Sequence, residues 1–282
     1  MAQSERSPCA GNALGWTCGA GATSSCGSKL IMDLTGKVAF VTGGSGDIGG
    51  SIARALAVSG ADVAISYVGN TEGAASTVEA IRNSGRRSAA IQLDQRDPSS
   101  IDACAANVLE EFKRLDILVN NAGWNIGIPF RDLDNLTAEI WDRVLETNVR
   151  GPYLLARAFA PHLRQNRSGR IVNIASLAGI APGGSSIAYA ASKSALIHLT
   201  HCLAVALAPE VTVNCIAPGL VEGTRMAERV PEESKKRARS QAVLGRTGSA
   251  QDIAEQVVTF CRAESVTGQV LVIDGGLPTG MR

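Results

Sequence analysis

Seven short apolar runs alternate with segments of helical spacing, and this alternation constrains the fold more than any other feature of the chain. The runs are apolar at consecutive positions, which is typical of strands in a sheet covered on both faces. They span residues 38–41, 63–66, 89–93, 117–119, 171–175, 211–216 and 270–273, and the helical segments span residues 48–59, 71–84, 98–113, 137–164, 188–207 and 250–262. This order predicts an α/β fold: a single doubly wound parallel sheet of seven strands, with right-handed crossovers and helices on both faces.

The first 31 residues differ from the rest of the chain. They are rich in Gly, Ser, Ala and Cys, show no periodicity, and lack the basic start and apolar core of a secretory signal. Because such a segment buries too little apolar surface to offset the entropy of ordering it, we expect a disordered tail over residues 1–31. Met32 directly precedes the first strand, which raises the hypothesis that translation starts there. Residues 32–282 contain no linker or break in composition and are predicted to form one domain.

Composition argues against several classes of function. The formal net charge is +1, so no basic field favours nucleic acid or a membrane surface as a partner, and no apolar run approaches the ~20 residues that span a bilayer. Seven cysteines show no C-x-x-C and no histidines at zinc-ligand spacing. We therefore expect no metal site, and free thiols in a reducing, cytoplasmic compartment. Those at positions 104, 202, 215 and 261 are interpreted as small core residues.

Residues with useful chemistry follow the predicted strands. Ligands of doubly wound sheets bind outside the carboxyl ends of the strands, where the strand order reverses. In this chain the residues just beyond strands one, three, four, five and six are Thr42 onward, Asp94, the Asn-Asn-Ala-Gly run at 120–123, Ser176, and Pro218 with Gly219. Because these loops all open at the same edge of a parallel sheet, the sequence predicts one shared binding cleft.

Residues 42–49 read Thr-Gly-Gly-Ser-Gly-Asp-Ile-Gly and lie between the first strand and the first helix. Gly44, Gly46 and Gly49 match the G-x-G-x-x-G pattern, in which bare backbone approaches a pyrophosphate and a helix N-terminus offers it unpaired N–H groups. This context predicts a nucleotide site in a Rossmann-type sheet. Since a carboxylate repels phosphate, we interpret Asp47 as the helix N-cap, with its side chain pointing away.

Tyr189 and Lys193 stand four residues apart in the helical segment 188–207, so they share a helix face. A neighbouring cation favours the phenolate and lowers the pKa of a phenol from its usual value of ~10, toward the range in which it acts as a general acid or base. Taken alone, the pair favours the simpler interpretation of two residues that merely share a helix. Its position thirteen residues after Ser176, beside the predicted cleft, favours the catalytic interpretation.

With Ser176, this pair, the glycine loop and the Asn-Asn-Ala-Gly run at 120–123, the chain resembles the short-chain dehydrogenase/reductase family, and within it the 3-oxoacyl-[acyl-carrier-protein] reductase-like group. The resemblance covers almost the whole chain after the first 33 residues. It implies that Tyr189 is the general acid/base, that Lys193 lowers the pKa of the phenol and holds the nicotinamide ribose, and that Ser176 hydrogen-bonds the substrate oxygen. Asn148 would carry a water relay that returns the proton.

The resemblance also implies how a dinucleotide is held. Asp94 would contact adenine, Asn121 and Gly123 would line the adenosine side, and the loop after strand six would cover the nicotinamide. The implied cofactor-binding residues are Gly43, Ser45, Asp47, Ile48, Tyr67, Asp94, Asn121, Ala122, Gly123, Tyr189, Lys193, Pro218, Gly219 and Val221.

The chain departs from the family's pattern in the phosphate loop and after Gly219. Asp47 stands at the family's middle glycine, Gly46 stands where members often carry an arginine, and Thr224 comes one residue later than the family's threonine. The end of the second strand, residues 66–70, offers no acid for a ribose 2′-hydroxyl and no base for a 2′-phosphate. Because a 2′-phosphate would not be repelled there, NADP(H) is favoured over NAD(H).

Features around the cleft indicate the kind of substrate. Trp124 and Leu177, beside Ser176, are expected to make partly apolar substrate contacts, and the mixed-charge run at 231–240 is expected to be a solvated helix and a candidate lid. The long segments 137–164 and 188–207 have more apolar faces than one sheet can cover, which favours a homotetramer.

The function that these patterns favour is NADPH-dependent reduction of a 3-oxoacyl group or another ketone, a small-molecule carbonyl. The alternatives are an NAD-dependent dehydrogenase of a secondary alcohol, cyclic polyol or sugar, and a nucleotide sensor without activity. The full set of Ser176, Tyr189, Lys193 and Asn148 argues against the sensor.

Overall fold

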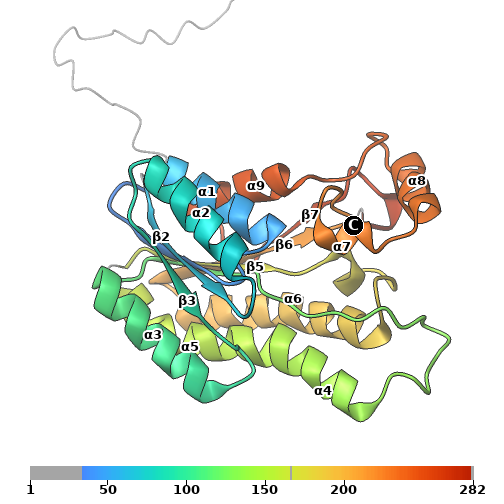
Figure 1. Ribbon diagram of the computed structural model, residues 1–282, viewed down its shortest axis with the longest axis horizontal. Helices are drawn as coiled ribbons and strands as arrows, with labels where there is room; N and C mark the ends of the chain where they lie inside the picture. The colour runs from blue at the N-terminus through green and yellow to red at the C-terminus, as the bar shows by residue number, and fades with distance from the viewer. Residues whose placement is uncertain (1–33, 166, 281–282) are drawn as a thin grey trace, which may run out of the picture. The chain divides into compact units, whose positions relative to one another are not determined.

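A seven-stranded parallel sheet forms the centre of the structure, a computed structural model that describes residues 34–165 and 167–280 (Figure 1). The strand order is β3-β2-β1-β4-β5-β6-β7. The strands are β1 (Val38–Val41), β2 (Asp62–Tyr67), β3 (Ser88–Gln92), β4 (Ile117–Asn120), β5 (Gly169–Ile174), β6 (Val211–Pro218) and β7 (Val270–Ile273). The order reverses between β1 and β4, which is the switch point expected of a doubly wound sheet. The predicted fold class is confirmed. The expectations for residues 1–31 and for Met32 lie outside the described residues.

The two edge strands differ from the expectation of runs buried on both faces. β3 alternates between shielded and exposed side chains, and every residue of β7 is only partly buried. An edge strand has a neighbour on one side only, so fewer side chains and helices cover it. The central strands β1, β4 and β5 are fully buried along their length, as predicted.

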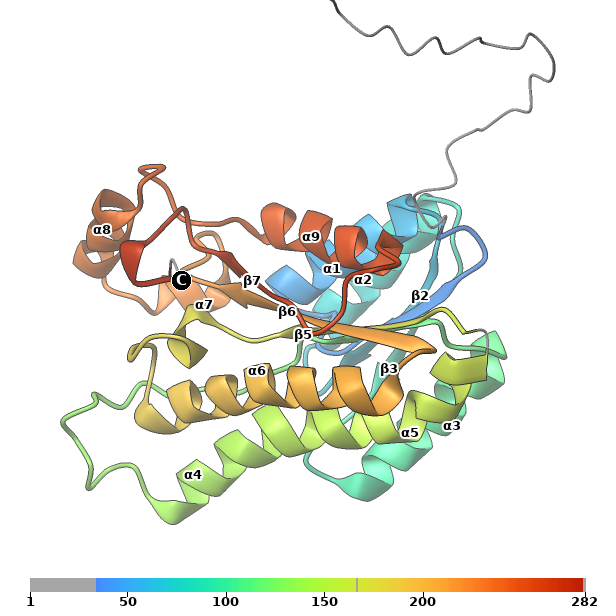
Figure 2. The ribbon, with the colours of Figure 1, turned by 180° about the vertical axis from the view of Figure 1, so that it is seen from behind.

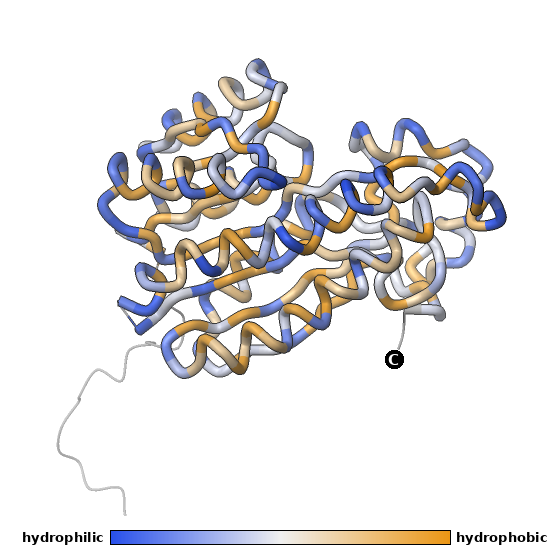
Figure 3. Tube along the Cα trace, turned by 90° about the horizontal axis from the view of Figure 1, so that it is seen from below, coloured by the Kyte–Doolittle hydropathy of each residue, from blue (hydrophilic) through white to orange (hydrophobic). Residues whose placement is uncertain are grey.

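Helices cover both faces of the sheet (Figures 1 and 2). One layer contains α1 (Asp47–Val58), α2 (Thr71–Asn83) and α9 (Ala250–Arg262), and the other contains α3 (Pro98–Phe112), α4 (Ala138–Leu145), α5 (Gly151–Gln165) and α6 (Ile187–Leu207). Each layer has its own apolar core. Ile52, Ile65 and Ile253 belong to the first, and Phe40 and Phe159 pack in the second with ring centroids 5.6 Å apart. Figure 3 shows hydrophobic residues running through the middle of the molecule and hydrophilic residues at its loops.

The helix predicted over residues 137–164 is not regular. A five-residue π-helical stretch, Glu146–Arg150, separates α4 from α5 without breaking the helical path. Such stretches insert one extra residue into a helix and are common at functional sites. Asn148 lies in the middle of this one with its side chain fully buried, so its hydrogen bonds explain why the wider turn forms there.

Two helices follow β6 outside the main layers, at the carboxyl edge of the sheet (Figure 1). The first, α7 (Arg225–Glu228), is a single turn that the sequence patterns did not indicate. The second, α8 (Glu232–Gln241), buries none of its residues and carries the ion pair between Lys235 and Glu232. The prediction of a solvated helix at residues 231–240 is therefore confirmed.

Two smaller expectations need correction. One is that all four cysteines from Cys104 onward are core residues, and the other is that no apolar segment approaches the length that spans a bilayer. Cys104, Cys215 and Cys261 are buried, but Cys202 is exposed on the outer side of α6. The same helix is long and apolar enough, by length and composition alone, to cross a membrane. Core helices of globular proteins pass that test as well, and α6 packs its buried side, including Leu196 and Leu203, against the rest of the fold.

Candidate active site

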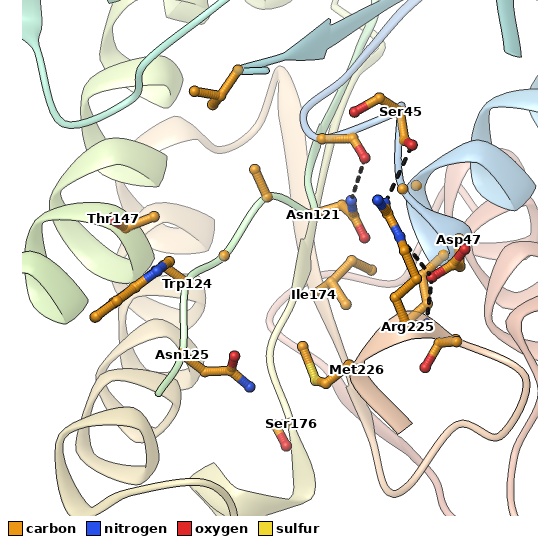
Figure 4. A pocket seen from close by; sticks show the side chains of 18 of the residues that line it. Ser45, Asp47, Asn121, Trp124, Asn125, Thr147, Ile174, Ser176, Arg225 and Met226 are labelled. Carbon is orange, nitrogen blue, oxygen red and sulfur yellow. Dashed lines mark hydrogen bonds and ion pairs between the residues drawn. The ribbon is translucent and has the colours of Figure 1, made fainter. Parts of the chain in front are cut away.

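A cavity of about 660 Å³ lies at the carboxyl ends of the strands, within the range of small-molecule and cofactor sites (Figure 4). Loops that follow β1 to β6 contribute to its wall, as does the start of α6. The predicted site residues that line it are Gly43, Ser45, Asp47, Ile48, Tyr67, Asp94, Asn121, Ala122, Gly123, Trp124, Ser176, Tyr189, Lys193, Pro218, Gly219 and Val221. The expectation of one shared cleft is confirmed.

The glycine loop presents bare backbone to this cavity. A Cβ atom on Gly44 would lie 2.5 Å from the Cβ atom of Ile65, and one on Gly49 would collide with the carbonyl oxygen of Gly43. Gly43 itself has a φ of +66°, a conformation that favours glycine. These positions therefore require glycine, because they let the loop pack closely against β2 and against the first turn of α1, whose N-terminal N–H groups are the kind that bind phosphate.

Hydrogen bonds fasten the loops of the switch point together. The hydroxyl oxygen of Thr42, directly after β1, accepts from the backbone N–H groups of Asn121 and Ala122 at 3.0 and 2.9 Å. The side-chain amide of Asn121 donates back to the carbonyl oxygen of Thr42 at 2.8 Å. Because both loops are held at this point, the floor of the cavity is formed before any ligand enters.

Asp47 is not the N-cap of α1, contrary to the prediction. The N-cap is Gly46, and Asp47 is the first residue of the helix. Its carboxylate accepts a hydrogen bond from the backbone N–H of Arg225 at 2.9 Å, and the Nε atom of Arg225 lies 3.6 Å from the same oxygen (Figure 4). The carboxylate therefore connects the glycine loop to α7, a contact between residues far apart in the sequence.

Ser176 and Tyr189 face each other across the start of α6. Ser176 follows β5, and its hydroxyl oxygen accepts from the backbone N–H of Ala178 at 3.2 Å. Ser186 caps α6 by accepting from the backbone N–H of Tyr189, also at 3.2 Å, which fixes the tyrosine in the first turn. The hydroxyl of Ser176 also donates to the carbonyl oxygen of Pro218 at 3.4 Å, and the side chains of Ser176 and Tyr189 line the same cavity.

Lys193 lies one turn after Tyr189 on the same face of α6 and is also buried. Its ammonium group donates to the carbonyl oxygen of Ile174 at 2.9 Å and lies 5.7 Å from the centroid of the Tyr189 ring. Burial disfavours the charged form, which lowers the pKa of the Lys193 ammonium from 10.5 to about 8.

The expected lowering of the Tyr189 pKa is not found. Burial raises the pKa of the phenol above its usual value, and the interaction with the Ser176 side chain offsets only part of this rise. Lys193 does not reverse it, because its ammonium donates to the carbonyl oxygen of Ile174. Tyr189 is therefore protonated at neutral pH.

Asn148 lies behind the cavity rather than in its wall. Its side-chain oxygen accepts from the backbone N–H of Trp124 at 2.8 Å, and its amide donates to the carbonyl oxygen of Trp124 and the hydroxyl of Ser192, both at 3.0 Å. Ser192 in turn donates to the carbonyl oxygen of Tyr189 at 2.7 Å. Asn148 thus connects the loop after β4 to the helix that carries Tyr189. The water relay implied for it stays a prediction.

Arginines that sequence reasoning left unassigned shape the other end of the cavity. Arg96 forms a two-pronged ion pair with Asp94, which holds the pKa of that carboxyl below its usual range. Arg143 lies over the indole of Trp124 at 4.2 Å, and Figure 4 shows this indole directed toward Thr147 and α4 rather than toward Ser176. Neither arginine directly follows a strand, so only the folded structure identifies them as residues of the cavity wall.

Other residues near the cleft have different positions from those expected. Leu177 starts a short 3₁₀ turn beside Ser176 but does not line the cavity, whereas Met226 of α7 does and faces Ser176 in Figure 4. Thr224 caps α7 and donates to the carbonyl oxygen of Val221 at 2.8 Å. His162, His198 and His201 do not line this cavity.

The cavity fits a dinucleotide. A Cβ on Gly123 would come within 3.3 Å of the Asn148 side-chain oxygen and 3.5 Å of the Lys193 nitrogen, so glycine at this position lets the cavity wall pack closely against both groups. The side-chain oxygen of Gln95, which lines the cavity, is buried without a hydrogen-bond partner among the described residues and offers an acceptor to a ligand. Among the residues that the structure describes, no group of His, Cys, Asp and Glu is arranged to hold a metal ion.

Comparisons with known proteins agree with this geometry. The family model described as enoyl-(acyl carrier protein) reductase matches residues 43–278. The 3-oxoacyl-[acyl-carrier-protein] reductase of Staphylococcus aureus is 36% identical over 246 residues, which cover 86% of this chain and 98% of the relative. The Escherichia coli enzyme of that name is 35% identical over 87% of this chain and 99% of its own length. A crystal structure of a short-chain dehydrogenase from Burkholderia cenocepacia in complex with NADP is 40% identical, covers 88% of this chain and 100% of its own, and superposes with a TM-score of 0.81.

Proposed function

Since the chain belongs to the short-chain dehydrogenase/reductase family, we propose that it is an NADPH-dependent reductase of a 3-oxoacyl thioester or a related ketone. It is an oxidoreductase that transfers a hydride between NAD(P)(H) and a carbonyl or secondary alcohol. The single observation that carries this proposal is the placement of Ser176 and the buried pair Tyr189 and Lys193 in the wall of one cavity.

In the proposed reaction the cofactor supplies the hydride, and residues of the cavity supply the proton and stabilise the developing charge. When bound, the nicotinamide supplies the hydride. Tyr189 and Ser176 both direct their hydroxyl groups at the position of a substrate oxygen, where negative charge develops during reduction. Ser176 stabilises that charge by hydrogen bonding, and Tyr189 neutralises it by donating its proton. Lys193, one turn away on α6 with its ammonium 5.7 Å from the centroid of the Tyr189 ring, holds the nicotinamide ribose in this proposal.

The names of the relatives, and not the ionisation of Tyr189, support reduction over oxidation. The same phenol gives up the proton in reduction and accepts it in oxidation, so its protonation state does not choose between the two directions. Relatives that are 35–36% identical are named 3-oxoacyl-[acyl-carrier-protein] reductases. The alternative is NAD-dependent oxidation of an alcohol, polyol or sugar.

The cofactor preference and the site roles follow from the lining of the cavity. Tyr67, Val68 and Gly69 line the end of β2 without a carboxylate that would repel a 2′-phosphate. The remaining cofactor contacts are proposed as in the sequence analysis, with the glycine loop at the pyrophosphate and Val221 at the nicotinamide. Met226, beside Ser176, replaces Leu177 as the proposed apolar substrate contact.

A panel of carbonyl compounds tests this proposal. Oxidation of NADPH and of NADH is followed at 340 nm with 3-oxoacyl thioesters, simple ketones and, as counter-substrates, 2-enoyl thioesters of the same chain length. We expect turnover of ketones with NADPH, and none of the enoyl compounds. A preference of more than about tenfold in kcat/KM for NADH would contradict the cofactor assignment. Turnover confined to alcohols with NAD would favour the alternative.

We also propose that the protein is a cytoplasmic homotetramer. Val205 on α6 is 82% exposed and Tyr153 on α5 is 45% exposed, and the partly buried edge strand β7 offers a further apolar surface. Light scattering after gel filtration measures the mass, with four chains expected. A stable monomer at micromolar concentration would contradict this proposal.

A further inference from the structure

We propose that Arg225 supplies the positive charge that selects the 2′-phosphate of NADP(H), a role for which neither the glycine loop nor the end of β2 provides a base. The inference rests on the proposed use of NADPH. Arg225 comes from α7, far along the chain, and its side chain returns to the glycine loop. It is 57% exposed on the cavity wall, so a ligand can reach it.

The guanidinium lies where a side chain at position 46 would otherwise project. A Cβ atom built on Gly46 would be 3.5 Å from a terminal nitrogen of Arg225. The same nitrogen approaches the carbonyl oxygen of Ser45 at 3.5 Å (Figure 4). Arg225 therefore brings a cation to this loop from outside it.

The contact point lies at the place where a ribose 2′ group is read. The side-chain amide of Asn70, just beyond β2, donates to the carbonyl oxygen of Ser45 at 2.7 Å. Arg225 thus approaches the same carbonyl oxygen that joins the glycine loop to the end of β2. In dinucleotide-binding sheets this junction meets the 2′ position, and an arginine there accommodates a 2′-phosphate.

The other arginines of the cavity already have different roles. Arg96 is paired with Asp94, and Arg143 is stacked on Trp124. Among the described residues, Arg229 shows no hydrogen bond or ion pair to the glycine loop. Of the arginines that line the cavity, this leaves Arg225 as the one in contact with that loop.

Asp47 positions Arg225 for this role. Its carboxylate accepts the backbone N–H of Arg225 at 2.9 Å, which anchors α7 to the loop independently of the guanidinium. The ion pair to Nε at 3.6 Å is long and part-exposed, so it contributes little energy and leaves the terminal nitrogens available.

The test compares cofactor selectivity in matched variants. Dissociation constants of NADPH and NADH are measured by cofactor fluorescence for the wild type, R225Q, and R229Q as the control from the same segment. We expect R225Q to weaken NADPH binding by about tenfold and to leave NADH binding nearly unchanged, since one charged hydrogen bond is lost. R229Q should keep the wild-type ratio of the two constants.

A rescue variant separates a direct role from a structural one. Gly46 has φ −100° and ψ 174°, which any residue adopts, and its open side admits a Cβ at ordinary contact distances. Adding G46R to R225Q should therefore restore the preference for NADPH from within the loop. The inference is overturned if R225Q weakens both cofactors equally, or if its ratio equals that of the wild type. A wild type that binds NADH as tightly as NADPH would instead contradict the proposed cofactor.

Discussion

The ammonium group of Lys193 donates a hydrogen bond to the carbonyl oxygen of Ile174 at 2.9 Å, at the carboxyl end of β5. This contact fixes the lysine between the sheet and the ring of Tyr189, with almost none of its surface exposed. The arrangement keeps a charge where hydride transfer needs one, and it makes that charge unfavourable for folding. The ionisation of Lys193 is therefore expected to affect both the free energy of unfolding and the affinity for the cofactor, and both should change with pH.

Replacing Lys193 by methionine is expected to stabilise the fold at neutral pH. The folded protein holds this lysine with a pKa of about 8 instead of 10.5, so keeping it charged below pH 8 costs up to about 3 kcal/mol of folding free energy. Above pH 8 the folded protein releases the proton before the unfolded chain does, and the cost disappears as pH approaches 10.5. Urea unfolding of K193M and wild type should show a difference that is largest at pH 7 and shrinks above pH 8. A difference that does not depend on pH would contradict this.

The affinity for the cofactor should depend on the same titration of Lys193, but here the charged form is the favourable one. Below about pH 8 the ammonium is charged and attracts the cofactor, and above it the charge is lost. The other ionisable groups packed near it, Tyr189 and Cys215, both have raised pKa values and stay neutral through this range. Fluorescence titration with NADPH should therefore show weaker binding as pH rises through 8. K193M should bind weakly at pH 7 and lack this transition.

Replacing Tyr189 by phenylalanine removes the proton donor and leaves the ring in place. We expect kcat for carbonyl reduction to fall by about 10³-fold, the usual contribution of a general acid. NADPH affinity should change by less than about threefold, because the hydroxyl group points at the substrate position beside Ser176. Stopped-flow reduction and fluorescence titration measure the two quantities separately. Turnover close to the wild-type rate would exclude Tyr189 as the donor.

The sequence patterns were sufficient where one local period decides the structure. Consecutive apolar residues identified the strands, and the i, i+4 spacing placed Tyr189 and Lys193 on one buried face of α6. The five post-strand loops converged because parallel strands end at the same edge. Each of these results follows from a repeating local pattern or from the general geometry of a parallel sheet.

The patterns failed where a distant contact decides the outcome. Asp47 looked like an N-cap because its local context is a helix start, but its partner is Arg225 on α7. The phenol of Tyr189 was expected to be acidic because Lys193 is near in sequence, yet burial, which depends on the whole fold, outweighs that proximity. The hydrophobic periodicity also could not predict the π-helical stretch around Asn148, because the side chain of Asn148 bonds there to Trp124 and Ser192, which lie far away in the sequence.

The last prediction concerns Asn148, whose side chain forms a hydrogen-bond circuit that joins the π-helical stretch to the loop after β4 and to α6. Replacement by alanine would leave the backbone N–H of Trp124 without its acceptor and the hydroxyl of Ser192 without its donor, at a cost of about 2 kcal/mol in unfolding free energy. The loop that carries Gly123 would then move relative to α6, so kcat should fall while the cavity can still bind cofactor. S192A is the matched control. It removes the hydrogen bond from Asn148 and the one to the carbonyl oxygen of Tyr189 but leaves both bonds between Asn148 and Trp124, so its effects on unfolding and on kcat should be smaller than those of N148A. Equal effects in the two variants would show that the loop is held by other contacts.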